Sequence, residues 1–299
     1  TTDNPVIELK MKQAAEAGAK VVLVNPEDYV QHIDFLNKAV YTKNDLSFLK
    51  EVAKAVVDSG RGAGVDGYEE FAASVKDVTV SDDAKAVADM YLEAKKAMIV
   101  FNQNLITTEA ASLLADIALV SEHIGTPRDG ILQVKAKNNS QGLVDLGITA
   151  GAEELEGVKA LVVFGEEADI DTDALEFLAV SDTHMTALAA KADVVIPGTG
   201  FASTDGTYTN TERRLQLVQA AIEEDVELAN WEIAAEIAHV FEVDYEWENT
   251  EDISVAMNDE VPAYKYAVVD EVLGGVLKPA DDARLAVIGD AKFADPIKC

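Results

Sequence analysis

Two polar segments of the chain carry residue types that could bind a ligand. The first, residues 138–142, reads NNSQG and places the amides of Asn138, Asn139 and Gln141 beside Gly142. Because amides both donate and accept hydrogen bonds, such a group suits a flat heterocyclic ligand. A polar surface turn has the same composition, and the residue types alone favour that interpretation.

The second segment is a glycine- and threonine-rich turn that follows an apolar run. Residues 193–216 read DVVIPGTGFASTDGTYTNTERRLQ. The pair Asp205-Gly206 is a hairpin signal, and TYTNT then alternates as a strand does. Thr207, Thr209 and Asn210 offer short polar groups there. The pattern predicts either a simple turn or a cradle for a phosphorylated or polar ligand.

Two adjacent arginines end this turn in a chain that is otherwise strongly acidic. The 299 residues include 55 acidic and 24 basic ones, for a net charge of -31. Arg213 and Arg214 are therefore rare cations, and a guanidinium group can hold a phosphate or carboxylate through two hydrogen bonds. Pairing with Glu212 or another acid of the chain is an equally good interpretation.

No self-contained catalytic machinery follows from the motifs. The sequence has no GxGxxG after a strand, no GxxxxGK[ST], no GxSxG and no HExxH, and GRGAG at 60–64 is interpreted as a linker. Its histidines are scattered at positions 32, 123, 184 and 239. His123 and His184 could line a crevice, although a surface or internally satisfied role is the favoured interpretation. The single cysteine, Cys299, excludes both a disulfide scaffold and a self-contained iron–sulfur cluster.

Short apolar runs and helical patterns alternate along the chain. The runs are continuous rather than alternating, which is typical of strands buried in a parallel sheet, and they lie at 20–26, 96–104, 159–167, 176–183 and 192–200. Helical spacing occurs at 4–19, 44–60, 81–94, 107–125 and 227–241. This order predicts an α/β fold with doubly wound, mostly parallel sheets flanked by helices. Ligands of such sheets bind outside the carboxyl ends of the strands, here Asn25, Asn102, Gly165, Asp182 and Pro197-Gly198.

Cap residues and composition place the boundaries of these elements. We expect helices to begin at Asn44 and at Thr107 or Thr108, and the first helix to end at Gly18. Residues 1–242 are predicted to form the α/β region, with a candidate subdomain boundary at SGRGAGVDG, residues 59–67. Residues 243–299 are predicted to be an acidic C-terminal extension.

The net charge also restricts the partners. A surface this acidic repels nucleic-acid phosphates and anionic lipid. It is either a solvated surface suited to a salty cytoplasm or a face that matches a basic partner subunit. The sequence contains no apolar run of about 18 residues and begins with no signal-peptide pattern. We therefore expect a cytoplasmic protein without membrane insertion, whose first residues read as the interior of a longer sequence.

Residues 175–222 resemble the C-terminal part of the molybdopterin oxidoreductase domain. They carry an ADVVLP-like strand and then the GT-x-x-N-x-E-x-R-x-Q turn. Residues 4–26, 96–148 and 159–169 resemble earlier units of that domain in the same order, so the resemblance covers about 4–241. It implies that the turn lies near a pterin dinucleotide. The family's cluster cysteines and metal-ligating cysteine or selenocysteine would precede Thr1, and its C-terminal barrel would follow Cys299.

Two branches of this family share the domain, and the chain departs from the catalytic one. Formate dehydrogenases carry a catalytic arginine before the NNxQG piece, where this chain has Lys135. Lysine does not replace a planar carboxylate clamp. The long insert after DLGI is missing, and the loop at 165–168 reads GEEA, without the family's proline and with acids that disfavour phosphates. The other branch comprises the large iron–sulfur subunit of NADH:quinone oxidoreductase and related complexes, in which the domain is commonly an empty relic.

The resemblance implies a cofactor-free scaffold domain in a multi-subunit NAD(P)H-linked electron-transfer complex. Its partners would be iron–sulfur and flavin subunits, and its vestigial pterin site would comprise Asn138, Asn139, Gln141, Gly142, Gly206, Thr207, Asn210 and Arg213. The alternative is a piece of an active molybdenum or tungsten formate dehydrogenase alpha subunit. In that case the site would hold molybdopterin, and Lys135 would orient formate.

Overall fold

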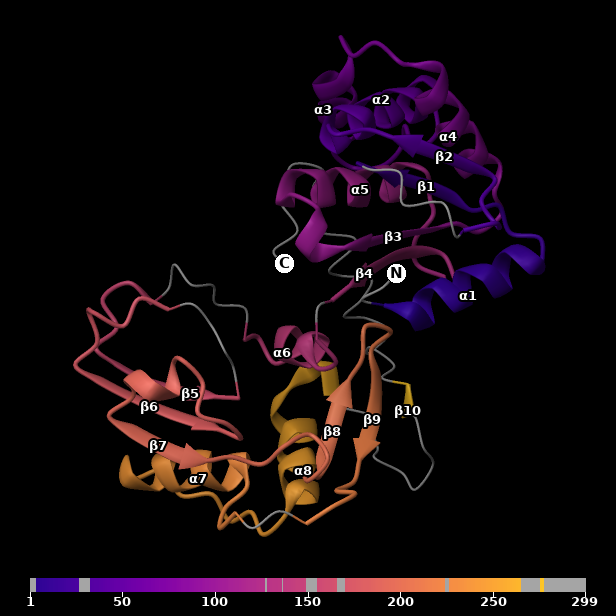
Figure 1. Ribbon diagram of the computed structural model, residues 1–299. Coiled ribbons are helices and arrows are strands. Elements are labelled where there is room, and N and C mark those ends of the chain that lie inside the picture. The colour runs from indigo at the N-terminus through magenta and orange to yellow at the C-terminus, as the bar shows by residue number, and fades with distance from the viewer. Residues whose placement is uncertain are drawn as a thin grey trace. The chain divides into compact units, whose positions relative to one another are not determined.

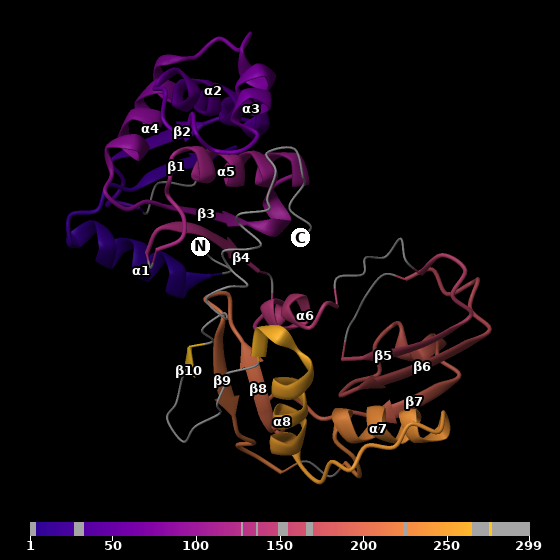
Figure 2. The same ribbon diagram turned by 180° about the vertical axis from the view of Figure 1, so that it is seen from behind.

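The structure, a computed structural model, describes residues 4–26, 33–126, 128–135, 137–148, 155–165, 170–223, 226–264 and 275–276. The described residues divide into two compact units, one up to Ser140 and one from Gln141 onward. Figures 1 and 2 show the elements of the two units from two sides.

The first unit combines parallel strand pairs with helices. Its strands are β1 (Val22–Asn25), β2 (Lys38–Tyr41), β3 (Met98–Asn102) and β4 (Gly130–Val134). β1 pairs with β2 and β3 pairs with β4, both in parallel. Its helices are α1 (Pro5–Glu16), α2 (Asp45–Asp58), α3 (Tyr68–Val75), α4 (Asp82–Glu93) and α5 (Thr108–Val120), with a short 3-10 turn, η2, at Gln103–Leu105.

The predicted helix boundaries in this unit are largely confirmed. The Asn44 side chain accepts a hydrogen bond from the Ser47 amide at 3.0 Å, and Thr107 accepts one from the Ala110 amide at 3.2 Å. Gly18 follows the end of α1 with φ +97°, a conformation that glycine adopts readily. The predicted helix 107–125 was too long: α5 stops at Val120, and the chain turns through Glu122 with φ +61°.

One hydrophobic core joins four of the helices of the first unit. Buried side chains of α2, α3, α4 and α5 form it, among them Val56, Phe71, Ala88 and Ile117. Residues 59–67, the candidate subdomain boundary, lie inside this unit and connect α2 to α3, whose residues share that core. Their glycines turn the chain: Gly62 has φ +73°, and a Cβ there would lie 2.3 Å from the Val120 carbonyl oxygen.

The second unit holds a parallel sheet and an antiparallel hairpin. The sheet has the order β5 (Ala160–Phe164), β6 (Phe177–Asp182), β7 (Val194–Pro197), all parallel. The hairpin pairs β8 (Gly206–Thr209) with β9 (Arg214–Val218), and β10 (Gly275–Val276) adds to β9. Helices α6 (Ser140–Asp145), α7 (Asn230–Val240) and α8 (Thr250–Glu260) and the 3-10 turns η4 (Ala189–Lys191) and η5 (Pro262–Tyr264) complete it.

The α/β fold predicted from the sequence is confirmed. Each of the apolar runs contains a strand of a parallel pair, namely β1, β3, β5, β6 and β7. Part of the predicted acidic extension is ordered around the hairpin: α8 runs beside β8 in Figures 1 and 2, and Met257, Val261 and Tyr264 pack with Leu215 of β9.

Candidate functional site

Lys135 lies directly after β4, near the carboxyl end of that strand, and it is buried, with 5% of its surface exposed. Its ammonium group donates to the Gln133 side-chain oxygen at 2.8 Å and lies 3.5 Å from that of Gln103. A buried ammonium group requires such oxygen partners, because burying a charge without partners costs on the order of several kcal/mol. Among the described residues, the lysine is therefore held inside the first unit by the amides of Gln133 and Gln103.

The chain passes from the first unit to the second within the NNSQG segment. Asn138 is exposed and Asn139 half-buried, both in the first unit, while Gln141 and the buried Gly142 belong to α6 in the second. The Gln141 amide nitrogen donates to Asp145, one turn later on α6, at 2.9 Å. The segment is thus partly a polar turn, as its composition favoured, and partly the start of a helix.

The glycine-threonine turn forms the β8–β9 hairpin, as Asp205-Gly206 predicted. Gly206 begins β8 with φ +138°, and Thr207 is half-buried on the same strand. The Asn210 side-chain oxygen closes the turn by accepting from the amides of Glu212 and Arg214, each at 2.9 Å. Asn210 is therefore a turn-forming residue, the usual use of asparagine in such positions.

Arg213 joins the two polar segments inside the second unit. Its guanidinium group donates to both carboxylate oxygens of Asp145, with a distance of 3.3 Å from Nε to Oδ2. The Asp145 side chain is 1% exposed and that of Arg213 is 42% exposed. Arg213 has φ +59°, so its backbone adopts the left-handed conformation in this turn. Arg214 pairs instead with Glu212, at 3.2 Å, so the acid-pairing interpretation holds for both arginines.

Thr209 has a buried partner that sequence patterns did not reveal. The hydroxyl groups of Thr209 and Tyr264 lie 2.7 Å apart, and each residue is 1% exposed. Burial, together with the negative charge of Asp145, raises the pKa of the Tyr264 hydroxyl, so this group stays neutral. Tyr264 was missed because it lies 55 residues from Thr209, in the segment predicted to be an acidic extension.

The carboxyl ends of β6 and β7 form a second polar group. Asp182 accepts from the Thr183 amide at 2.7 Å, and Ser181 donates to the Asn230 side-chain oxygen at 3.2 Å. Gly198 after β7 is buried, and a Cβ there would lie 2.8 Å from the Ser181 hydroxyl. Asn230 begins α7, so the start of this helix lies beside the carboxyl end of β6, and the helix runs alongside β7 (Figure 1). The remaining strand ends, Asn25, Asn102 and Gly165, close β1, β3 and β5.

His123 and His184 have the internally satisfied and surface roles that the sequence analysis favoured. Both ring nitrogens of His123 are engaged, Nδ1 with Asp129 at 2.9 Å and Nε2 with the Tyr91 carbonyl at 3.0 Å. Burial alone would raise the pKa of Asp129, but hydrogen bonds from the Ala97 amide and His123 lower it. His184 is exposed and lies 2.8 Å from the Thr183 hydroxyl. His32, the loop residues 166–168 and Cys299 lie outside the described residues.

Two structural features bear on metals and membranes. Within the described residues, no three or more histidine, cysteine, aspartate or glutamate side chains gather as a metal-ion site would require. Nor does any helix among them have the length and apolar character needed to cross a bilayer.

Comparisons with known proteins place this geometry in one family. The model of the family described as molybdopterin oxidoreductase matches residues 2–240. The chain is similar to the F420-dependent formate dehydrogenase subunit alpha of Methanocaldococcus jannaschii, with 24% identity over 88% of this chain and 49% of that protein. It is also similar to formate dehydrogenase H of Escherichia coli, with 22% identity over 93% of this chain and 49% of that protein. The chain thus spans about half the length of these relatives.

A solved structure supports the same fold. Acetylene hydratase from Pelobacter acetylenicus superposes with a TM-score of 0.68 at 11% identity, over 89% of this chain and 49% of that one. At this identity the likeness concerns the fold alone. Together with the family match over 2–240, it leads to one conclusion: the chain belongs to the molybdopterin oxidoreductase family, and formate dehydrogenase alpha subunits are among its relatives.

Proposed function

We propose that this chain is a non-catalytic, cofactor-free scaffold domain of a multi-subunit, NAD(P)H-linked electron-transfer complex in the cytoplasm. Iron–sulfur and flavin subunits would carry the redox groups, and this domain would hold them together. Relatives named as alpha subunits support the existence of partner subunits.

The observation that carries the proposal is the internal pairing of the polar residues in the turn. Arg213 and Gln141 both donate to Asp145, and the Asn210 oxygen accepts from two backbone amides. The Thr209 hydroxyl pairs with Tyr264. A pterin dinucleotide is anionic and needs free donors and cations, and this donor set does not fit it, because its arginine already neutralises a buried carboxylate.

Lys135 supports the proposal independently. It stands where the resemblance places a catalytic arginine, and its ammonium group is buried against Gln133. A lysine can offer a carboxylate a point charge but not the planar, two-donor grip of a guanidinium group. A buried lysine held by amides is better explained as part of the interior of the first unit.

A second candidate function is formate oxidation, which the relatives favour because several are named formate dehydrogenases. The chain would then contribute Asn138, Asn139, Gln141, Gly206, Thr207 and Asn210 to a pterin site, with Lys135 directed at formate. The molybdenum or tungsten pterin would supply the redox chemistry. The internal pairing described above would have to open for these side chains to reach a ligand.

The variant Lys135→Met in the native complex separates the two functions, because methionine keeps the volume of the lysine stem without its charge. We expect NAD(P)H oxidation with an artificial acceptor to be unchanged and formate-dependent reduction to be absent both before and after the substitution. Formate-dependent reduction that the variant abolishes, with the complex still assembled on a sizing column, would establish formate oxidation instead.

A further inference from the structure

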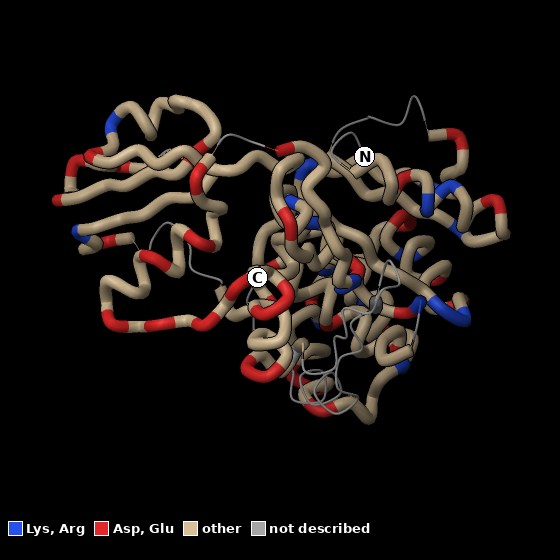
Figure 3. The backbone as a smooth tube through the Cα atoms, turned by 90° about the horizontal axis from the view of Figure 1, so that it is seen from below, with Lys and Arg blue, Asp and Glu red and all other residues tan. Residues whose placement is uncertain are grey.

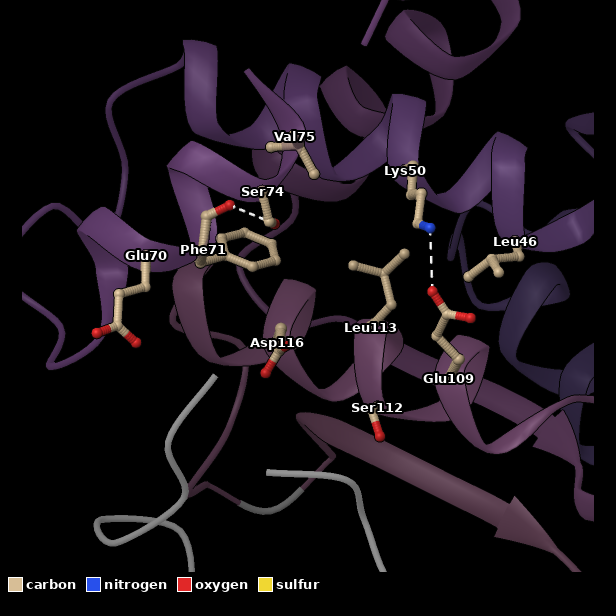
Figure 4. Close-up of a pocket in the computed structure, with 10 residues that line it drawn as sticks. All are labelled: Leu46, Lys50, Glu70, Phe71, Ser74, Val75, Glu109, Ser112, Leu113 and Asp116. Carbon is tan, nitrogen blue, oxygen red and sulfur yellow. Dashed lines mark hydrogen bonds and ion pairs between the residues drawn. The ribbon is translucent and has the colours of Figure 1, made fainter. Parts of the chain in front are cut away.

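A groove among three helices of the first unit has no part in the proposed pterin site. It measures about 470 Å³ and lies between α2, α3 and α5. Its apolar lining comes from Leu46, Phe71, Val75 and Leu113. Figure 4 shows these side chains around the groove, with Glu70 to their left and Asp116 below Phe71.

The charges around the groove are unbalanced. Lys50, the one basic residue of the lining, donates to Glu109 at 3.0 Å and is neutralised by it. Glu70 is exposed and Asp116 half-buried, and neither has a hydrogen bond or ion pair with the described part of the chain. The groove therefore combines an apolar floor with two carboxylates that lack a cation among the described residues.

Asp116 is the group for which this imbalance matters most. Its burial among apolar neighbours raises its pKa to about 7, so the carboxylate is costly to ionise near neutral pH. A cation placed beside it would offset that cost and favour the charged form. The charged groups that line the groove with Asp116 are Lys50, Glu70 and Glu109, and none of them supplies a free cation.

A lysine or arginine side chain has the shape and charge that this groove lacks. Its apolar stem can lie on the apolar edge of the groove, beside Leu46 and the small exposed part of Leu113, while its charged end reaches Asp116. A cation of this chain is a scarce partner, because acidic residues outnumber basic ones 55 to 24. Figure 3 shows acidic positions along the traces of both units. A basic segment of another protein is the complementary occupant.

We propose that the groove between α2, α3 and α5 binds a lysine or arginine side chain from a basic, amphipathic segment of a partner subunit, with Asp116 as the anchoring carboxylate. This site is independent of the pterin region and goes beyond the scaffold function by locating one of its docking surfaces.

The ligand chemistry is tested with n-hexylammonium and its neutral counterpart hexan-1-ol, titrated by NMR against the full chain at pH 8. Hexylammonium should bind about 10- to 150-fold more tightly than hexanol, the difference that a charged hydrogen bond of about 1.5–3 kcal/mol makes. The Asp116→Asn variant should remove that difference, while Glu109→Gln, a change to the already paired acid, should leave most of it. Equal affinities for the two probes in the unmodified protein would overturn the proposal.

The source of the cation is tested in the native complex with a photo-crosslinking amino acid at the exposed position Ser74, on the rim of the groove. Mass spectrometry should identify a cross-link to a lysine- or arginine-containing segment of a partner subunit, lost at 1 M salt. A cross-link to this chain's own residues, or to an acidic or purely apolar segment, would contradict a basic partner even if hexylammonium binds.

Discussion

At the scale of single residues, two buried or half-buried carboxylates, Asp145 and Asp116, differ in whether a cation neutralises them. Asp145 is almost fully buried and is neutralised by Arg213, while Asp116 is half-buried and has no such cation among the described residues. The Asp145–Arg213 pair stabilises the second unit. Asp116 makes the stability of the first unit depend on pH.

Replacing Arg213 with methionine should destabilise the protein by about 1–3 kcal/mol. A buried carboxylate left without its partner costs about 3–5 kcal/mol, and the 42% exposure of Arg213 lets water offset part of that. The neighbouring Arg214→Met is the matched control, because its pair with Glu212 is exposed and should contribute less than about 1 kcal/mol. Urea unfolding measures both, and equal losses would show that Arg213 has no special role.

Replacing Asp116 with asparagine should stabilise the free protein more at pH 8 than at pH 5. The raised pKa means that the folded state holds a proton that the unfolded state releases between about pH 4 and pH 7. The free energy of unfolding of the unmodified protein therefore falls as pH rises through this range. Asparagine has no proton to release, so the variant does not show this fall. Thermal unfolding of both proteins across pH 5–8 checks this, and a melting difference that does not grow with pH would argue against a desolvated Asp116.

Residue types predicted the site only in part. Thr209, Asn210 and Arg213 stood out because hydroxyl, amide and guanidinium groups cluster after a turn signal. Their partners Asp145 and Tyr264 did not, because they lie 68 and 55 residues away and no local pattern encodes such contacts. The sequence left two interpretations of Arg213 and Arg214 open, ligand binding and pairing with acids. Only the contacts in the structure showed that both pair with acids.

At the scale of elements, continuous apolar runs, clear helical periodicity and the hairpin signal predicted well, whereas weakly patterned elements were not identified. The five continuous apolar runs each contain a strand, whereas β2 and β4 were not identified, since β2 has only two apolar residues between Lys38 and Tyr41 and Gln133 interrupts the apolar run of β4. The helix α8 was missed because its sequence TEDISVAMNDE is acidic and its periodicity weak. This helix is stabilised by tertiary packing on the hairpin, and a local sequence pattern does not reveal such contacts.

The connection between α2 and α3 gives a matched pair of glycines. Gly60 and Gly62 have nearly equal φ values, +74° and +73°, but an added Cβ has open space at Gly60 and meets the Val120 carbonyl at Gly62. Gly60→Ala should therefore cost about 1–2 kcal/mol from backbone strain alone. Gly62→Ala should cost about 2 kcal/mol more, because the backbone of α5 has to move. Similar losses in chemical unfolding would mean that the connection between α2 and α3 does not approach α5 this closely.

The attachment of η5 to the hairpin can be measured through the Thr209–Tyr264 hydrogen bond. Tyr264→Phe should destabilise by about 1 kcal/mol, since one buried hydrogen bond is lost while the ring stays packed. A double-mutant cycle with Thr209→Val should give a coupling energy of about 1 kcal/mol. A coupling near zero would indicate that the segment after residue 242 does not depend on the hairpin.

At the scale of the whole molecule, an acidic chain of the molybdopterin oxidoreductase family carries polar residues that bind one another. The family match and the formate dehydrogenase relatives account for the fold and for the order of its motifs. Lys135, the paired Arg213 and the closed turn at Asn210 support a domain retained for its architecture. The net charge of -31 then suits docking to basic surfaces of partner subunits.

The most direct measurement is the molybdenum and tungsten content of the purified native complex by mass spectrometry, together with the fluorescence of oxidised pterin released from the same sample. We predict both metals and the pterin at background, with iron and flavin present in the partner subunits. Molybdenum or tungsten near one atom per copy of this chain, with pterin in the same amount, would contradict the scaffold function and identify an active site of the formate dehydrogenase type.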